Sequence, residues 1–318
     1  RAGGARGARE GRLPGETAPR LAAESVRPTE LARTLRAHDG AVLAYRLARP
    51  GAPRRLVVLL HGLASNLTRW SEFVARTSLT GSWDILRLDL RGHGGSLHRG
   101  RIGVDEWCAD LAEILEAEGH RRAVLVGHCL GANVAIEFAH RHPDRAVGLV
   151  LVEPMLRQAL TGAMGRIARL RPLFVPVARL IRALNALGLH RQHVAPLDLE
   201  ALDRETRATM AQARTADALV KRYASPWLDL RTTASGAYLQ SLIAVSGDLP
   251  DLATIRTPAL ALLSTGTAFS DPALTERLLA AMPNCAIVRL DAHHWIPTER
   301  PDEMRRAIEE FCQTDRQN

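Results

Sequence analysis

A short stretch near the middle of the chain limits the possible folds more than any other feature. Residues 125–135 read LVGHCLGANVA, in which an apolar run ends at Gly127 and a helix-forming run begins after Gly131. A sharp turn from a strand into a helix needs small residues on both sides. The pattern therefore predicts that the side chain of Cys129 is pushed out above a sheet, at the N-terminus of a helix.

A thiol at that position can act as a nucleophile. The positive end of a helix dipole favours loss of the thiol proton, and the thiolate is the reactive form of cysteine. The alternative is a buried structural cysteine in a loop that happens to be flanked by glycines. The turn alone leaves both interpretations open.

The rest of the chain alternates between predicted strands and helices. Several strands are continuous Val/Leu/Ile runs, which is typical of parallel strands buried on both faces. We expect strands at Leu31–Arg36, Val42–Ala48, Leu56–Leu60, Asp84–Leu88, Ala123–Val126, Val147–Val152, Ala259–Leu263 and Ala286–Leu290. Helices are expected around Trp70–Arg76, Val104–Glu118, Asn133–Arg141, Pro272–Ala281 and Pro301–Cys312. Two antiparallel strands followed by strand–helix repeats predict a doubly wound α/β sheet.

Three regions are expected. Residues 1–30 are rich in Arg, Gly, Ala and Pro with few apolar anchors, which is typical of a disordered arm. Residues 31–153 and 257–318 carry the strand–helix repeats. Residues 154–256 are helix-rich and strand-poor, so we expect a helical cap over the C-terminal edge of the sheet, where ligands of α/β proteins bind.

Composition narrows the partners and the compartment. The formal net charge is +8, but nearly all basic residues are arginine and no basic helix or aromatic platform is evident, so a nucleic-acid partner is not expected. The four cysteines, Cys108, Cys129, Cys285 and Cys312, show no metal-binding spacing. With no apolar run long enough for a membrane span and no secretory pattern at the start, we expect a cytoplasmic protein with reduced thiols. No metal or other cofactor is expected.

Three further segments extend the pattern. Residues 57–62, VVLLHG, are an apolar strand that ends in His61 and Gly62, followed by Leu63. A glycine at a strand exit lets backbone N–H groups turn inward, where they can stabilise an oxyanion. Residues 88–96 read LDLRGHGGS, and residues 290–304 read LDAHHWIPTERPDEM.

Together these four segments resemble the α/β-hydrolase family, in the family's order, over about residues 31–314. The resemblance implies an α/β-hydrolase fold, a mostly parallel eight-stranded sheet with a helical cap inserted after the sixth strand. It implies that His294 is the catalytic base, with His293 a bystander, and that the N–H groups of Leu63 and Leu130 form an oxyanion hole. It gives mostly structural, supporting roles to His61, Gly62, Asp89, His93, Gly127, His128 and Gly131.

The family's catalytic triad consists of a nucleophile, a histidine and an acid, and the acid is where this sequence departs from the family pattern. The slot that usually holds an aspartate falls on Thr267, which cannot carry a negative charge. Glu153, at the end of the preceding strand, is the preferred substitute, because some family members place the acid there. Asp271 is the alternative acid, and a Cys-His dyad is the third possibility, since a thiolate needs less help than a serine hydroxyl.

Cysteine at the turn limits the chemistry. Dehalogenases and epoxide hydrolases of this family form an alkyl ester on a carboxylate, which cysteine cannot do. Acyl chemistry remains: hydrolysis, transfer or cyclisation of an ester, lactone or thioester through a covalent Cys129 thioester. The turn at residues 127–131, which we call the elbow, resembles the elbows of dienelactone hydrolases. The long cap is typical of a thioesterase-like or acyltransferase-like tailoring enzyme of secondary metabolism. The alternative is a pocket enzyme that works without an acyl-enzyme, or a small-molecule binding protein.

The expected cap carries a charge bias. Residues 154–197 contain no Asp or Glu and seven arginines: Arg157, Arg166, Arg169, Arg171, Arg179, Arg182 and Arg191. Interspersed apolar residues predict amphipathic helices broken by Pro172 and Pro176. A basic rim could meet the phosphopantetheine of an acyl thioester, a substrate carboxylate or an anionic membrane. The alternative is an ordinary cap whose arginines face water.

Overall fold

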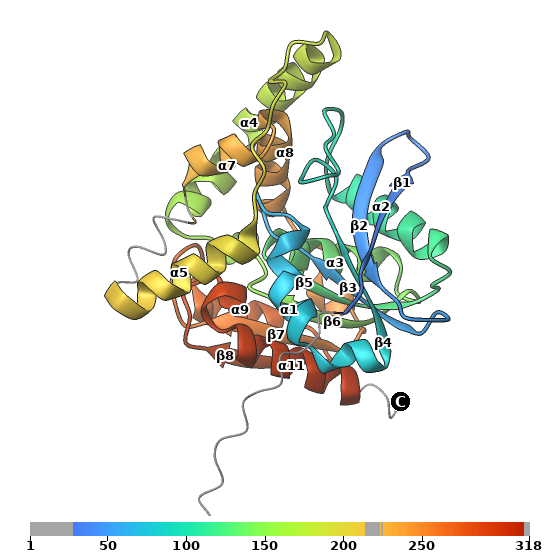
Figure 1. Cartoon of the computed structure of the whole chain (residues 1–318). Coiled ribbons are helices and arrows are strands. Elements are labelled where there is room, and N and C mark those ends of the chain that lie inside the picture. Colours follow the sequence, from blue (N-terminus) through green and yellow to red (C-terminus); the bar gives the residue numbers. More distant parts are fainter. Residues whose placement is uncertain (1–27, 214–222, 224, 315–318) are drawn as a thin grey trace, which may run out of the picture.

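A sheet of eight strands lies at the centre of the computed structural model, which describes residues 28–213, 223 and 225–314 (Figure 1). The strand order is β1-β2-β4-β3-β5-β6-β7-β8; β2 runs antiparallel to β1 and β4, and the other pairs are parallel. The strands are β1 (Leu31–Arg36), β2 (Val42–Ala48), β3 (Arg55–Leu60), β4 (Trp83–Leu88), β5 (Ala123–His128), β6 (Ala146–Val152), β7 (Ala259–Ser264) and β8 (Cys285–Leu290). This confirms the predicted mostly parallel α/β-hydrolase sheet. The predicted arm lies outside the described residues up to residue 27, and Glu30 pairs with Arg87.

The central strands are apolar on both sides because helices cover both faces of the sheet. Along β3, Val58 belongs to one buried cluster, with α2 (Val104–Ala117) and α3 (Leu130–Arg141). The next residue, Leu59, points to the other cluster, with α1 (Ser71–Arg76) and α11 (Pro301–Thr314). Successive strand side chains point to opposite faces, so a strand covered on both sides reads as a continuous apolar run.

Short elements connect the strands and helices of these layers. They are η1 (Leu67–Trp70), η2 (Ser78–Gly81), η3 (Arg157–Ala159), η4 (Leu252–Thr254), α9 (Pro272–Leu279) and α10 (Ile296–Glu299). Because β3, β5, β6 and β7 are parallel neighbours, the loops that follow them meet at one edge of the sheet.

Helices above this edge are inserted between β6 and β7. They are α4 (Gly162–Ala186), α5 (Leu199–Ala213), α7 (Pro226–Thr232) and α8 (Ser235–Val245), drawn in yellow-green to orange in Figure 1. The prediction that Pro172 and Pro176 break the first of these helices is wrong, since α4 continues through both. Both prolines are exposed, so their rings do not enter the packed face of the helix.

Two features are absent from the residues that the structure describes. None of the helices there is long and apolar enough to span a bilayer. No cluster of three or more His, Cys, Asp or Glu side chains in those same residues is arranged to hold a metal ion.

Candidate functional site

Cys129 sits at the turn between β5 and α3. Its backbone φ is +52°, its N–H donates to Val152 O at 2.9 Å, and its carbonyl accepts from Ala132 N at 3.0 Å. A Cβ added to Gly127 would lie 2.3 Å from the carbonyl carbon of Gly131, so no larger residue fits there. The glycines therefore allow β5 and α3 to meet closely, and the closeness places the thiol above the sheet.

Left-handed backbone marks three strand exits around this turn. Ala64, Cys129 and Glu153, with φ of 49°, 52° and 52°, are the only residues other than glycine with positive φ in the described chain. They follow β3, β5 and β6, which are neighbours in the sheet. Such strain costs free energy and is concentrated at functional sites, where the surrounding structure holds it in place.

His294 lies between two of these residues. Its Nδ1 donates to Glu153 Oε2 at 3.0 Å, and its ring is also hydrogen-bonded to the Cys129 thiol. Since Nδ1 is engaged with the carboxylate, Nε2 is the nitrogen on the side of Cys129. The other oxygen of Glu153 accepts the backbone N–H of Ser264, at the end of β7, so the carboxylate is fixed from two sides.

The electrostatics of the site favour a charged imidazole. Burial would lower the pKa of His294, but its hydrogen bonds to Cys129 and Glu153, together with the negative charge of both groups, raise that pKa to about 10. The side chain of His294 is only 4% exposed, so water screens these interactions weakly. In the charged ring, Nδ1–H therefore faces the Glu153 carboxylate, and Nε2–H faces the Cys129 sulfur.

The competing candidates lie elsewhere. Asp271 caps α9, where its side chain accepts from Leu274 N at 3.1 Å. Thr267 is exposed. His293 points away from Cys129 and bonds Glu299 at 2.8 Å, with its side chain 40% exposed. Of Thr267, Asp271 and Glu153, only Glu153 is hydrogen-bonded to His294.

The remaining motif residues support the loops. His61 Nδ1 donates to Gly62 O at 2.8 Å, and its Nε2 accepts from Leu90 N at 3.0 Å. Asp89 accepts the backbone N–H groups of Leu67 and Gly95, both at 2.7 Å. Because these contacts join the loops after β3 and β4, they hold the strand exits in place.

His128 and His93 are buried neutral rings. Burial lowers the pKa of His93 to about 4 and that of His128 well below its ordinary value. His128 donates from Nε2 to the carbonyl of His294 at 3.3 Å, which ties the elbow to the histidine loop.

Two backbone N–H groups beside Cys129 are available. Within the described residues, neither Leu63 N nor Leu130 N donates to any acceptor. Leu130 is the first residue of α3, so its N–H also carries the positive end of the helix dipole. Unpaired donors near a nucleophile can stabilise an oxyanion.

A cavity of about 170 Å³ opens beside Cys129 and His294. Its walls combine the core and the cap, and most are apolar. They include Met155, Met164, Ile167, Leu202, Leu242, Val245, Phe269 and Trp295. Polar groups at its surface include Arg69, Tyr223, Asp229 and Tyr238.

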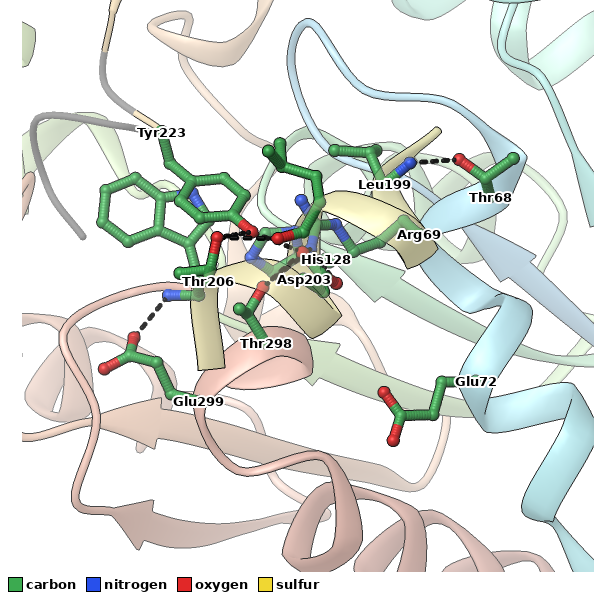
Figure 2. Close-up of polar contacts among 12 residues, drawn as sticks. Thr68, Arg69, Glu72, His128, Leu199, Asp203, Thr206, Tyr223, Thr298 and Glu299 are labelled. Carbon is green, nitrogen blue, oxygen red and sulfur yellow. Dashed lines mark hydrogen bonds and ion pairs between the residues drawn. The ribbon is translucent and has the colours of Figure 1, made fainter. Parts of the chain in front are cut away.

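A buried polar network closes one side of the cavity (Figure 2). Arg69 Nη1 donates to both carboxylate oxygens of Asp203, at 2.8 and 2.6 Å, and to Thr298 Oγ1 at 2.8 Å. The Tyr223 hydroxyl donates to Asp203 at 2.6 Å. Arg69 and Thr298 belong to the core, and Asp203 lies on α5, so the network ties the cap to the sheet domain.

Comparison with known proteins fits this geometry. The family model described as "Serine aminopeptidase, S33" matches residues 51–296, which is more than half of the chain. The chain belongs to this family of α/β hydrolases. Its match to the family includes β3, the Cys129 elbow and the loop of His294.

Individual relatives of this α/β hydrolase are distant. RutD of Caulobacter segnis, whose name assigns it carbamate hydrolysis, is 34% identical over 106 residues, which are 32% of this chain and 39% of that protein. The match thus spans well under half of the curated relative's length.

Solved structures match over most of the chain. A hydrolase from Pseudomonas aeruginosa has a TM-score of 0.63 at 25% identity and covers 88% of this chain and 98% of its own. An enol-lactonase from Burkholderia xenovorans also has a TM-score of 0.63, at 22% identity, and covers 88% and 100%. The second likeness concerns the fold alone.

Two side chains of this α/β-hydrolase site had no predicted role. Glu299 accepts the backbone N–H groups of His293, His294 and Trp295, at 3.0 to 3.3 Å, and so shapes the histidine loop. Arg69 lines the cavity and pairs with Asp203, 134 residues away. The sequence could have indicated Glu299, because an acid in the first turn of a helix often accepts backbone N–H groups of the preceding loop. No local sequence pattern indicates that Arg69 pairs with Asp203.

Proposed function

We propose that the protein is an acyl hydrolase or acyltransferase that works through a thioester on Cys129. The observation that carries the proposal is the position of His294, which is hydrogen-bonded to Glu153 on one side and to Cys129 on the other. Membership of a hydrolase family supports hydrolysis as the underlying chemistry. We expect an ester, lactone or thioester as the substrate, because its leaving group departs readily when the Cys129 sulfur attacks and the thioester intermediate forms.

In the first step the Cys129 sulfur attacks the acyl carbon, and a carbon–sulfur bond forms. The carbonyl oxygen becomes an oxyanion, which the N–H groups of Leu63 and Leu130 are placed to stabilise. When the bond to the leaving oxygen or sulfur breaks, protonated His294 gives its proton to the leaving group. Glu153 holds the ring in position and stabilises its positive charge.

In the second step an acceptor attacks the thioester carbon. His294, now neutral, takes the proton of the acceptor, the carbon–sulfur bond breaks, and the Cys129 thiolate returns beside the imidazolium. Water gives hydrolysis, whereas an alcohol or an amine gives transfer or cyclisation. The mostly apolar cavity walls favour an organic acceptor that can exclude water from the site.

The cavity limits the acyl group. Its volume of about 170 Å³ is close to that of an engineered apolar cavity of about 150 Å³ that admits benzene. A short or medium acyl chain, or one aromatic ring, therefore fits next to Cys129. An acyl group carried on phosphopantetheine would need its carrier arm to remain outside the cavity.

Intact-protein mass spectrometry tests the proposal. The protein is incubated briefly with acyl thioesters and activated esters of increasing chain length, then digested and mapped. We expect an acyl adduct on Cys129 that is absent in Cys129→Ala and present in Cys285→Ala. Cys285 is the matched control because it is partly exposed and lies on β8, away from the elbow. Products formed with added alcohols or amines then separate transfer from hydrolysis.

One result would overturn the proposal. If no acyl adduct forms and iodoacetamide also leaves Cys129 unmodified, the thiol is not a nucleophile. Ligand binding that survives Cys129→Ala would then indicate a pocket enzyme without an acyl-enzyme, or a binding protein.

A further inference from the structure

Exposed apolar side chains gather on α4. Seven of the twelve large apolar side chains exposed in the described chain lie between residues 170 and 189. Six of them form what we call the apolar stripe: Leu170, Leu173, Val177, Leu180, Leu184 and Leu187. Their spacing alternates between three and four residues, which places them along one side of the helix.

The apolar stripe faces away from the protein. The buried residues of α4, which include Met164, Ala168 and Ala178, lie on its other side. Toward the C-terminal end, Ile181 and Asn185 meet Gly236 of α8. Figure 1 shows the C-terminal part of α4 reaching beyond the sheet domain. The helix therefore has one face packed on the protein and another face open, with leucines up to 75% exposed.

Charge distinguishes the possible occupants of this face. Residues 154–197 contain seven arginines and no acidic residue, and Arg166, Arg169 and Arg179 of α4 are exposed. If two copies of α4 paired through the stripe, arginine would face arginine with no carboxylate on either helix to balance it. An anionic lipid surface accepts both features, since leucines enter the interface while arginines meet the headgroup phosphates.

We propose that α4 is an interfacial helix, which docks the protein on anionic bilayer surfaces through the apolar stripe and its exposed arginines. Ala163, Met164 and Ile167 of the same helix line the cavity beside Cys129. Docking through the stripe would therefore place this helix between the bilayer and the cavity. The proposal does not depend on the chemistry of Cys129.

Vesicle flotation with the full chain tests the docking. Phosphatidylcholine vesicles are compared with vesicles of equal parts phosphatidylcholine and phosphatidylglycerol. The stripe variant carries Leu173→Gln, Leu180→Gln and Leu187→Gln, and the arginine variant carries Arg166→Glu, Arg169→Glu and Arg179→Glu. The control variants, Leu31→Gln with Val42→Gln and Arg121→Glu with Arg306→Glu, change exposed residues of similar types away from α4.

We expect the wild type and both controls to float with the anionic vesicles and not with the neutral ones. Each arginine near an anionic surface is worth about fivefold in partitioning, so losing three arginines should weaken binding about 100-fold, and the three glutamates should weaken it further. The stripe variant should lose binding to a similar or greater extent, and added salt should weaken the wild type.

Several outcomes would overturn the proposal. The wild type could fail to bind anionic vesicles, or the stripe variant could bind as well as the wild type. Light scattering adds a further test: a wild-type dimer that does not bind vesicles and that the stripe variant converts to a monomer would show that the stripe pairs with a second copy.

Discussion

Replacing Glu153 by glutamine tests the role of the carboxylate without changing its size. The backbone N–H of Ser264 requires an acceptor, so the amide oxygen of the new side chain should remain on that side. The amide NH₂ group then faces His294 Nδ1, which must accept instead of donate. The ring proton moves to Nε2, toward Cys129, and a ring in that tautomer cannot take a proton from the nucleophile.

The size of the effect follows from the lost contact. A hydrogen bond to a charged group is worth about 1.5 to 3 kcal/mol, and each 1.36 kcal/mol of barrier is tenfold in rate. We therefore expect Glu153→Gln to slow acylation of Cys129 by about 10- to 150-fold.

The assay is single-turnover acylation by an activated ester, followed by mass spectrometry. Asp271→Asn is the matched control, because asparagine caps a helix as well as aspartate does and Asp271 caps α9. It should leave both the rate and the stability unchanged. Full activity in Glu153→Gln, or a large loss in Asp271→Asn, would refute the assignment of the acid.

Further expectations concern stability and pH. Gly131→Ala would place a Cβ 2.4 Å from Leu60 O and should destabilise the protein by about 3 kcal/mol in urea unfolding, whereas Gly51→Ala, with open space around it, should change little. Asp203→Ala leaves Arg69 buried without its counter-charge and should cost about 3 to 5 kcal/mol by thermal unfolding; a smaller loss in Asp203→Ala combined with Arg69→Met would show that the unpaired charge is the cause. The folded-state pKa of His294, about 10, exceeds its ordinary 6.5, so the stability it contributes is complete below about pH 6.5 and is lost as the pH rises through 10. Urea unfolding between those pH values should therefore show a steeper decline in the wild type than in His294→Gln, and equal slopes would contradict the raised pKa.

Much of the sheet could be read from local pattern. All eight strands occur where they were predicted, and the central ones were the plainest, because a strand buried on both faces must be apolar along its whole length. The elbow was equally visible, since only glycine fits where Gly127 and Gly131 approach other backbone.

The acid was harder to place, because it depends on contacts that no local pattern describes. Glu153 and His294 are 141 residues apart. Glu153 follows β6 and His294 follows β8, and their side chains meet because β6, β7 and β8 are consecutive parallel strands whose exits lie at one edge of the sheet. The left-handed backbone of Glu153 also has no signature in the sequence. The prediction that the prolines break α4 was wrong for a related reason, because whether a helix tolerates a proline depends on which face of the helix is packed.

The sequence by itself determined the order of strands and helices, the glycine-flanked turn and the position of Cys129, because each depends on residues close together in the chain. Tertiary structure alone decided which acid reaches His294, which groups enclose the cavity and which side of α4 remains open. These depend on how distant segments pack, and packing assigns a different environment to side chains of the same type. Leucines of the sheet core are therefore buried, whereas leucines of the apolar stripe are exposed.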